Sequence, residues 1–396
     1  MSLSLSPRQL VHTALPDAEL FISAPGRVNL LGEHIDYNAG VVLPAAINKR
    51  VWLAVNALEE KTLRVKSIDL DQTVVIRFAD LTAKIDVEGR PLPNWALYPA
   101  AVVWVMLAKG YELKGLHAVM ASDLPMRVGL SSSAAVEIAF GLALQTLNDI
   151  EMDRMQLAKL CQLAENRYIG VQCGLMDHFA ASHGVARHAL YFDTRSFEWQ
   201  PIPLPADCAL VIADSGKERE LAHSAYNQRR QECQMALRYL QGQDSSIQSL
   251  RDVSLEQFAD WKANLPDIPT KRAQHVIEEI DRVQQAALCL VQEDVERFGE
   301  LLYAGHDSLR DLYEVSCAEL NFLVDAAKGL PGCLGARLTG AGFGGCTVNV
   351  VQKALAQEFA ASLAAAYEQK FGIKLTTIIC LPDRGAFVEK SEEAVS

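Results

Sequence analysis

The stretch of this chain that carries the most information is Ala24-Pro25-Gly26-Arg27-Val28-Asn29-Leu30-Leu31-Gly32-Glu33-His34-Ile35-Asp36-Tyr37-Asn38. Seven of its last twelve residues are polar or ionisable. A carboxylate such as Glu33 or Asp36 can accept hydrogen bonds from two hydroxyl groups, which suits recognition of a sugar. Arg27 is a permanent cation that suits a transferring phosphoryl group. A solvated loop with one salt bridge is the alternative, but the neighbouring glycine and proline residues favour a built site.

A second stretch, Asp123-Leu124-Pro125-Met126-Arg127-Val128-Gly129-Leu130-Ser131-Ser132-Ser133-Ala134, precedes a predicted apolar helix. Small residues let backbone N–H groups approach an anion, and a helix N-terminus adds a favourable dipole. Serine hydroxyls can also donate to phosphate or bind Mg²⁺. A plain serine N-cap would explain one serine. The run from Gly129 to Ala134 instead favours a phosphate-binding loop.

A third stretch is Leu338-Thr339-Gly340-Ala341-Gly342-Phe343-Gly344-Gly345-Cys346. It has G-x-G-x-x-G spacing, but a dinucleotide-binding fingerprint must lead from a strand into a helix. The following residues, 346–351, are predicted as a strand, so that class of site is excluded. A glycine loop between strands can lie close to a ligand or simply make a tight turn, and the sequence leaves both open.

The composition excludes several classes of function. The 396 residues are 50% hydrophobic and 22% charged, as in an ordinary globular protein of two or three domains. The net charge of −12 argues against binding nucleic acid or anionic membranes. P-loop and protein-kinase signatures are absent.

The cysteine pattern favours a reducing, cytoplasmic compartment. The nine cysteines form no CxxC pair, which argues against a disulfide framework or a zinc site. His178 and His183 lack a recognised zinc spacing and are expected at the surface or in helix caps. Neither a signal peptide nor a transmembrane run is predicted, and we expect a monomer.

The periodicity of apolar residues predicts strands mixed with helices, followed by a helix-rich second half. Strands are predicted at residues 19–23, 40–58 with a break near Pro44, 63–67, 73–78, 117–122, 188–192, 209–214, 335–339, 346–351 and 375–381. Helices are predicted at residues 95–109, 132–148, 154–168, 176–182, 222–241, 270–292, 294–312 and 353–371. This order indicates a two-domain α+β protein. The proline-containing segment 197–206 is the expected domain boundary.

Together the three stretches resemble the three motifs of the GHMP kinase superfamily, and the first resembles the signature of the galactokinases. Further matching segments follow in the expected order: Ala164-Glu165, Cys173-Gly174-Leu175-Met176-Asp177, Tyr226-Asn227 and Arg229-Arg230. The resemblance implies a ribosomal S5-like N-terminal domain, residues 1–200, with the sugar and phosphate-loop motifs. It implies a ferredoxin-like C-terminal domain, residues 201–396, with the third motif, and an active-site cleft between the domains.

The resemblance also implies an activity and residue roles. The expected reaction is phosphorylation of the C1 hydroxyl of galactose by ATP, with Mg²⁺ as cofactor. Asp177 would be the general base and Arg27 the catalytic cation. Sugar contacts would come from Glu33, His34, Asp36, Gly174 and Tyr226. The phosphate loop would be Gly129, Leu130, Ser131, Ser132, Ser133 and Ala134, with Ser133 and Glu165 on Mg²⁺. The third motif would be Gly340, Gly342, Gly344 and Gly345.

Three residues depart from the usual galactokinase pattern. Ile35 replaces Thr, Arg127 replaces Gly in the phosphate loop, and His178 replaces Gln after the base. Arg127 either contacts phosphate or points to solvent, and solvent is favoured. A structural role is favoured for His178, because neighbouring helical side chains point about 100° apart. These changes bear on sugar specificity and nucleotide affinity rather than on the type of reaction.

Two alternatives remain open at this point. One is a kinase of the same superfamily for another sugar, such as arabinose or N-acetylgalactosamine. The segment Asn38-Ala39-Gly40 lacks the Cys of the N-acetylgalactosamine-directed relatives, which favours galactose. The other is a non-catalytic galactose sensor, whose relatives lose residues of the phosphate loop. Ser133 and Ala134 are present here, so an enzyme is favoured.

Overall fold

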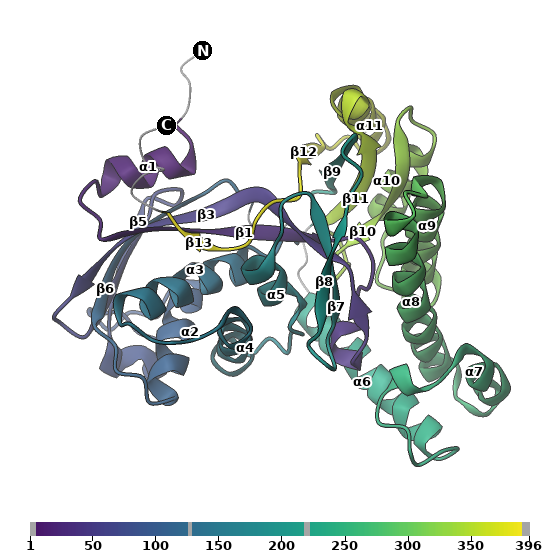
Figure 1. Cartoon of the computed structure of the whole chain (residues 1–396), viewed down its shortest axis with the longest axis horizontal. Coiled ribbons are helices and arrows are strands. Elements are labelled where there is room, and N and C mark those ends of the chain that lie inside the picture. Colours follow the sequence, from purple (N-terminus) through teal and green to yellow (C-terminus); the bar gives the residue numbers. More distant parts are fainter. Residues whose placement is uncertain (1–4, 126–128, 218–221, 390–396) are drawn as a thin grey trace.

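The computed structural model describes residues 5–125, 129–217 and 222–389. The described chain forms three sheets with helices packed around them (Figure 1). Their strand orders are β13-β1-β3-β6-β4-β5, β10-β11-β9-β12 and β2-β7-β8. The arrangement confirms the predicted α+β class.

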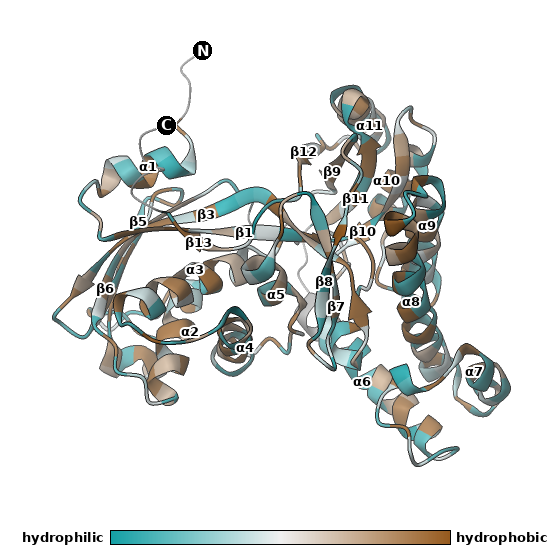
Figure 2. Cartoon of the chain, viewed as in Figure 1, coloured by the Kyte–Doolittle hydropathy of each residue, from teal (hydrophilic) through white to brown (hydrophobic). Residues whose placement is uncertain are grey.

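The six-stranded sheet holds the first motif. Its strands are β1 (Leu20–Asn29), β3 (Pro44–Leu58), β4 (Thr62–Ser67), β5 (Gln72–Arg77), β6 (Gly115–Ser122) and β13 (Phe387–Val388). Neighbouring strands run antiparallel, except that β4 and β6 run parallel. The helices below it in Figure 1 are α2 (Asn94–Ala108), α3 (Ser132–Leu147), α4 (Arg154–Ala164) and α5 (Met176–His183). Hydrophobic residues dominate α2 (Figure 2), because α3 and α4 pack against it.

An irregularity in β1 brings the first motif to the second. The register with β3 shifts between Pro25 and Arg27, where proline cannot donate a ladder hydrogen bond. A β-carbon on Gly26 would lie 2.6 Å from the carbonyl oxygen of Leu130, so only glycine permits this approach. The backbone N–H of Arg27 donates to that same oxygen at 3.1 Å. Strand β1 is thereby joined to the predicted phosphate loop.

The four-stranded sheet has the topology predicted for the C-terminal part. Its strands are β9 (Cys208–Asp214), β10 (Cys333–Thr339), β11 (Cys346–Gln352) and β12 (Thr376–Cys380), all antiparallel. Helix α10 (Ala318–Lys328) precedes β10, and α11 (Ala356–Phe371) precedes β12. This is the ferredoxin-like βαββαβ arrangement. Between β9 and α10 lie α6 (Ala222–Gln241), α7 (Leu255–Trp261), α8 (Asp267–Val291) and α9 (Val295–Asp311).

The small sheet consists of β2 (Val41–Val42), β7 (His188–Asp193) and β8 (Trp199–Pro203). Strand β8 lies within the segment where the domain boundary was expected, and its prolines are tolerated because it is an edge strand. Near the C-terminus, β13 pairs with β1. The division at residue 200 stays a prediction.

Several short elements escaped the sequence analysis, namely α1 (Pro7–Ala14), α7, α10, β8 and β13. Helix α1 has a readable signal, because Ser6 and Gln9 form a capping box and Pro7 occupies its first turn. The helix predicted at 154–168 is α up to Ala164 and a π-helix over Glu165–Ile169. Such π segments frequently mark functional sites.

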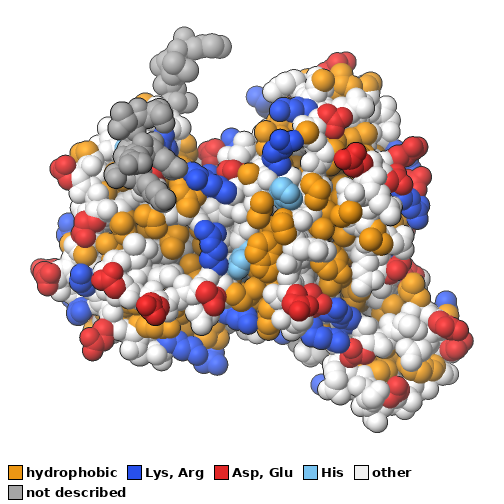
Figure 3. Space-filling view, viewed as in Figure 1, with side chains coloured by type: hydrophobic (Ala, Val, Ile, Leu, Met, Phe, Trp, Pro, Cys, Tyr) orange, Lys and Arg blue, Asp and Glu red, His pale blue; other side chains and the backbone are white. Residues whose placement is uncertain are grey.

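The described helices and surface show two further features. None of the helices within the described residues is both long and apolar enough to cross a membrane. Acidic and basic side chains are intermixed on the face of the molecule shown in Figure 3.

Candidate active site

Arg27 and Asp177 form the centre of the site. Arg27 lies on β1 and is buried, and Asp177 lies in the first turn of α5. Nε of Arg27 donates to Oδ1 of Asp177 at 2.8 Å, and Nη2 donates to Oδ2 at 2.9 Å. Nη1 of Arg27 donates to the carbonyl oxygen of Gly129 at 2.6 Å. The same guanidinium therefore holds the carboxylate and the loop of the second motif together.

The second motif also contacts Asp177 directly. Ser131 is the N-cap residue of α3 and has a left-handed backbone (φ 55°). Its hydroxyl donates to Oδ2 of Asp177 at 2.5 Å. Ser132 and Ser133 follow in the first turn of α3 and are partly exposed. The N–H groups of a first helical turn have no partner within the helix and suit an anion. Arg127 lies outside the described residues.

Asp36 and Gly174 pack together beside this pair. A β-carbon on residue 174 would lie 1.7 Å from Oδ2 of Asp36, so glycine is required there. Burial, followed by the nearby charge of Asp177, raises the pKa of Asp36 to about 6. Asp36 is thus a partly buried acceptor close to the Asp177 carboxylate.

His34 takes part in a chain of hydrogen bonds with a defined direction. Its Nε2 is 3.1 Å from the carbonyl oxygen of Ala341, which can only accept, so Nε2 carries the proton. Burial lowers the pKa of His34 to about 4, so the ring is neutral and Nδ1 accepts from the Tyr37 hydroxyl at 2.9 Å. The Tyr313 hydroxyl, 2.8 Å from that of Tyr37, must then donate to it. Cys233 lies 3.0 Å from Tyr313 and completes the chain.

Tyr226 closes the aromatic side of this cluster. The centroid of its ring lies 5.3 Å from that of His34 and 5.4 Å from that of Tyr37. The Arg230 guanidinium lies over the Tyr37 ring at 5.7 Å and also donates to the carbonyl oxygen of Gln172. The predicted sugar contacts His34, Asp36, Gly174 and Tyr226 are therefore brought to one place.

Glu33 lies in a buried charge network. Its Oε2 is 2.6 Å from Nη2 of Arg337, and Nη1 of Arg337 donates to Oε1 of Glu279 at 2.9 Å. Glu279 also accepts from the backbone N–H of Gly32 and pairs with Arg282. Burial raises the pKa of Glu33 to about 7, and the charge of Arg337 opposes that rise. This predicted sugar contact therefore joins the first motif to β10 and α8.

The third motif is fixed to the first at the ends of two strands. Asn29 donates its backbone N–H to Oγ1 of Thr339 at 3.0 Å, and that hydroxyl donates back to the carbonyl oxygen of Asn29. The predicted glycines all have positive φ: Gly340, Gly342, Gly344 and Gly345. A β-carbon on Gly340 would lie 3.3 Å from the carbonyl oxygen of Gly129. The tight turn thus also lies against the phosphate loop.

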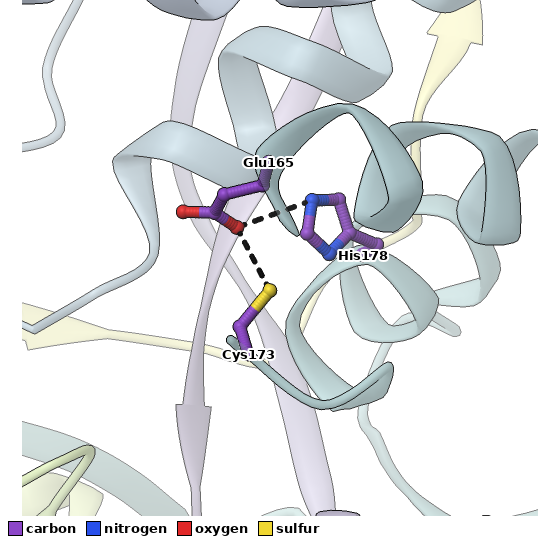
Figure 4. Close-up of side chains that lie close together, drawn as sticks. All are labelled: Glu165, Cys173 and His178. Carbon is purple, nitrogen blue, oxygen red and sulfur yellow. Dashed lines mark hydrogen bonds and ion pairs between the residues drawn. The ribbon is translucent and has the colours of Figure 1, made fainter. Parts of the chain in front are cut away.

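A cluster of cation-binding groups adjoins Asp177 (Figure 4). Oε2 of Glu165 is 3.2 Å from Sγ of Cys173 and 3.5 Å from Nε2 of His178. Burial, followed by the charge of Glu137, raises the pKa of Glu165 to about 7. A buried carboxylate of this kind fits a divalent cation. Ser133 lies four residues before Glu137 on the same face of α3, and Glu137 reaches His178 at 2.6 Å.

One expectation about the histidines was wrong, and several site residues were missed. His178, expected at the surface or in a cap, is buried within α5. His183 is also buried, but its Nδ1 lies 3.3 Å from the carbonyl oxygen of Phe179 in the last turn of α5, which agrees with a capping role. Helical spacing pointed to a structural role for His178, and its hydrogen bond to Glu137 agrees with that role. Arg337, Glu279 and Tyr313 were not singled out. Arg337 lies only one residue before the quoted third stretch, whereas nothing local marks the other two.

Comparison with known proteins shows matching families along the chain. Residues 11–57 match the galactokinase galactose-binding signature. Residues 98–185 match the N-terminal domain of GHMP kinases, and residues 285–369 match their C-terminal domain. A galactokinase of Roseiflexus sp. (strain RS-1) is 43% identical over 92% of this chain and 92% of its own length. One of Chloroflexus aggregans is 40% identical over 93% of this chain and 94% of its own.

Solved structures give the same result. The galactokinase of Lactococcus lactis, solved in complex with galactose, superposes with a TM-score of 0.88 at 32% identity. The match covers 96% of this chain and 98% of that one. The mevalonate kinase of Methanococcus jannaschii shares the fold alone, with a TM-score of 0.65 at 18% identity. The chain therefore belongs to the galactokinase family of the GHMP kinases.

Proposed function

We propose that this protein transfers the γ-phosphate of ATP to the C1 hydroxyl of galactose, giving galactose 1-phosphate and ADP. The observation that carries this proposal is the paired Arg27 and Asp177, which lie where the sugar cluster meets the phosphate loop. The galactose-binding signature and the relative solved with galactose support the choice of sugar. The family supports ATP as the phosphate donor.

Asp177 would act as the general base. It accepts the proton of the C1 hydroxyl as that oxygen attacks the γ-phosphorus, and a positioned base typically contributes about 10²–10⁴-fold in rate. Arg27 orients the carboxylate through two hydrogen bonds and places a fixed positive charge beside the transferring group. Ser131 fixes the same carboxylate from the loop side. Positioning and charge stabilisation are the main requirements of phosphoryl transfer.

The phosphates would lie at the N-terminus of α3. Residues 129–134 offer backbone N–H groups and hydroxyls there. Glu165 and Ser133 would hold Mg²⁺; burial and the charge of Glu137 raise the pKa of Glu165 to about 7, and a bound cation would favour its charged form. Mg²⁺, when bound, supplies charge neutralisation on the β- and γ-phosphate oxygens.

The sugar would be held by His34, Asp36 and Tyr226, with Gly174 leaving room for Asp36. Neutral His34 donates Nε2–H to Ala341 in this structure, which fixes the ring next to the third motif. Glu33 would accept a hydrogen bond from a sugar hydroxyl, and its ion pair with Arg337 would set the orientation of its carboxylate. Buried polar groups of this kind reject analogues that leave them unpaired.

A panel of acceptors tests the assignment. ADP release is measured with ATP and Mg²⁺ against galactose, arabinose, glucose, N-acetylgalactosamine and mevalonate. We expect kcat/KM for galactose to exceed that for every other acceptor by at least about tenfold, or about 1.4 kcal/mol. Equal or better turnover of arabinose or N-acetylgalactosamine would overturn galactose as the substrate. Sugar and ATP binding without ADP release would instead indicate a sensor.

We also propose a cytoplasmic, monomeric enzyme. None of the nine cysteines, all of which lie in the described residues, forms a disulfide, which supports a reducing compartment. Size-exclusion chromatography with light scattering tests the monomer, and a mass of about twice 43.4 kDa would contradict it.

A further inference from the structure

Four side chains from separate segments meet behind Asp177. Glu165 begins the π-helix, Cys173 lies in the loop before α5, His178 lies in α5, and Glu137 lies in α3. Nε2 of His178 is 2.6 Å from Oε2 of Glu137 and 3.5 Å from Oε2 of Glu165. Figure 4 shows the Cys173 thiol and the His178 ring both directed at the same oxygen of Glu165. The ligand atoms of Glu165, Cys173 and His178 all lie within 4.8 Å of one another.

This donor set differs from that of a magnesium site. Mg²⁺ prefers oxygen ligands, whereas a thiolate with an imidazole selects a softer cation such as Zn²⁺. Zinc bonds of about 2.0–2.3 Å at tetrahedral angles place donor atoms roughly 3.3–3.7 Å apart. The separations of 3.2 Å and 3.5 Å around Oε2 of Glu165 already approach that spacing. Small side-chain shifts would complete it.

Two buried polar atoms of the cluster lack hydrogen-bond partners. Oε1 of Glu137 and Nδ1 of His178 are both buried without a hydrogen-bond partner. A buried carboxylate oxygen in this state is unfavourable, and a cation beside it would remove the deficit. Glu137 therefore places a buried carboxylate beside the three residues drawn in Figure 4, in contact with His178.

We propose that Glu165, Cys173 and His178, with the carboxylate of Glu137 beside them, form a binding site for a thiophilic divalent cation, with Zn²⁺ as the representative ion. Binding releases the Cys173 thiol proton, and any proton held on the carboxylates, to solvent. Cys173 is partly exposed whereas the other three residues are buried, so the ion enters past the thiol. The sequence argued against a zinc site because it showed no local spacing of ligands. The fold assembles these donors from separate segments.

Occupation of this site would inhibit phosphoryl transfer, a consequence that rests on the function proposed above. Figure 4 shows one carboxylate oxygen of Glu165 directed at Cys173 and His178 and the other directed away from them. A thiophilic ion would fix Glu165 toward the thiol and withdraw it from its proposed role on Mg²⁺. Zn²⁺ inhibition should therefore be competitive with Mg²⁺.

Binding is tested on the full chain without ATP or sugar. Co²⁺ is titrated in a non-chelating phosphine reductant, and a thiolate-to-cobalt charge-transfer band is followed in the near ultraviolet. Zn²⁺ is then added to displace it. We expect one equivalent of each ion in the parent chain, loss of the band in Cys173→Ser, and affinity at least about tenfold lower in His178→Gln. Cys333→Ser, a cysteine partly exposed on β10, serves as the matched control and should bind like the parent chain.

Two outcomes would overturn the site. One is the absence of a thiolate band in the parent chain. The other is a band that survives in Cys173→Ser or is lost equally in Cys333→Ser. Two variants are used because His178→Gln introduces the residue usual in galactokinases, which keeps the test open if Cys173→Ser folds poorly.

The inhibitory effect is tested separately. ADP release is measured over a range of Zn²⁺ at low and high Mg²⁺ in the parent chain and in His178→Gln. We expect the apparent inhibition constant to rise with Mg²⁺ and to be at least about tenfold higher in the variant. Equal inhibition of both proteins would contradict the coupling. An inactive parent chain that still binds Co²⁺ would refute the proposed function and leave the metal site standing.

Discussion

Arg27 on β1 donates hydrogen bonds to both carboxylate oxygens of Asp177 on α5, at 2.8 Å and 2.9 Å. Its third nitrogen donates to the carbonyl oxygen of Gly129 in the phosphate loop. A bidentate guanidinium restricts rotation of the carboxylate. The position of the proposed base is therefore set by the strand and the loop as well as by its own helix. Catalysis and the placement of the second motif depend on the same side chain.

Asp177→Asn tests the base. The variant keeps the shape of the side chain but cannot accept a proton, so kcat should fall by about 10²–10⁴-fold. Galactose affinity, measured by calorimetry, should change little, whereas the melting temperature should fall because the buried Arg27 loses its charged partner. Retention of most of the activity would exclude Asp177 as the general base.

Gly174→Ala tests the packing of the sugar cluster. The new β-carbon would lie 1.7 Å from Oδ2 of Asp36, so the carboxylate must move. We expect KM for galactose to rise by at least about tenfold, or about 1.4 kcal/mol. Gly329→Ala is the control, because the nearest atom to a β-carbon there is 3.7 Å away. An unchanged KM in Gly174→Ala would show that Asp36 does not contact the sugar.

Asp36→Asn tests the raised pKa of this carboxyl group. The pKa of Asp36 is about 6 in the folded state against an ordinary value of 3.8, so the folded state binds this proton more tightly than the unfolded state does. The contribution of Asp36 to stability is therefore lost as the pH rises through that window. The variant should melt a few degrees above the parent chain near pH 8, with the gap closing near pH 4.

The matched control for this pH effect is the exposed Asp260, whose replacement by Asn should alter the melting temperature equally at both pH values. Galactose binding by Asp36→Asn should weaken, which separates its role in the site from its effect on stability. A difference in melting temperature that does not vary with pH would contradict the assigned pKa shift.

Arg337→Met tests the charge network under Glu33. The substitution leaves Glu33 and Glu279 buried without this cation, so unfolding measured in urea should show a loss of about 3–5 kcal/mol. Arg297→Met removes an exposed pair with Glu300 and should change stability by less than about 1 kcal/mol. Losses of similar size in both variants would show that the buried network contributes no more to stability than an exposed ion pair.

The sequence predicted the main elements because their signals are local. The break before β3 falls at Pro44, and the helix after the phosphate loop begins at Ser132, both as expected. Strand β8 was missed because Pro201 and Pro203 suggested a linker, yet an edge strand tolerates proline. Short amphipathic helices such as α7 give too few turns for a clear periodicity.

The candidate site was predicted by motif, but its contacts were not. Ser131 was expected on phosphate, and its hydroxyl instead donates to Asp177 in this structure. The ion pair of Glu33 and Arg337 joins the two ends of the chain, so no spacing in the sequence could show it. The roles given to these residues stay predictions until the variants are measured.

The position of the new phosphate ester is the most direct measurement. Galactose labelled with ¹³C at C1 is incubated with ATP, Mg²⁺ and the protein, and the product is examined by ¹³C and ³¹P NMR. We expect the C1 resonance to split by coupling to phosphorus, and the splitting to vanish in Asp177→Asn. A phosphate on C6, or labelled sugar left unchanged by an otherwise folded protein, would contradict transfer to the C1 hydroxyl.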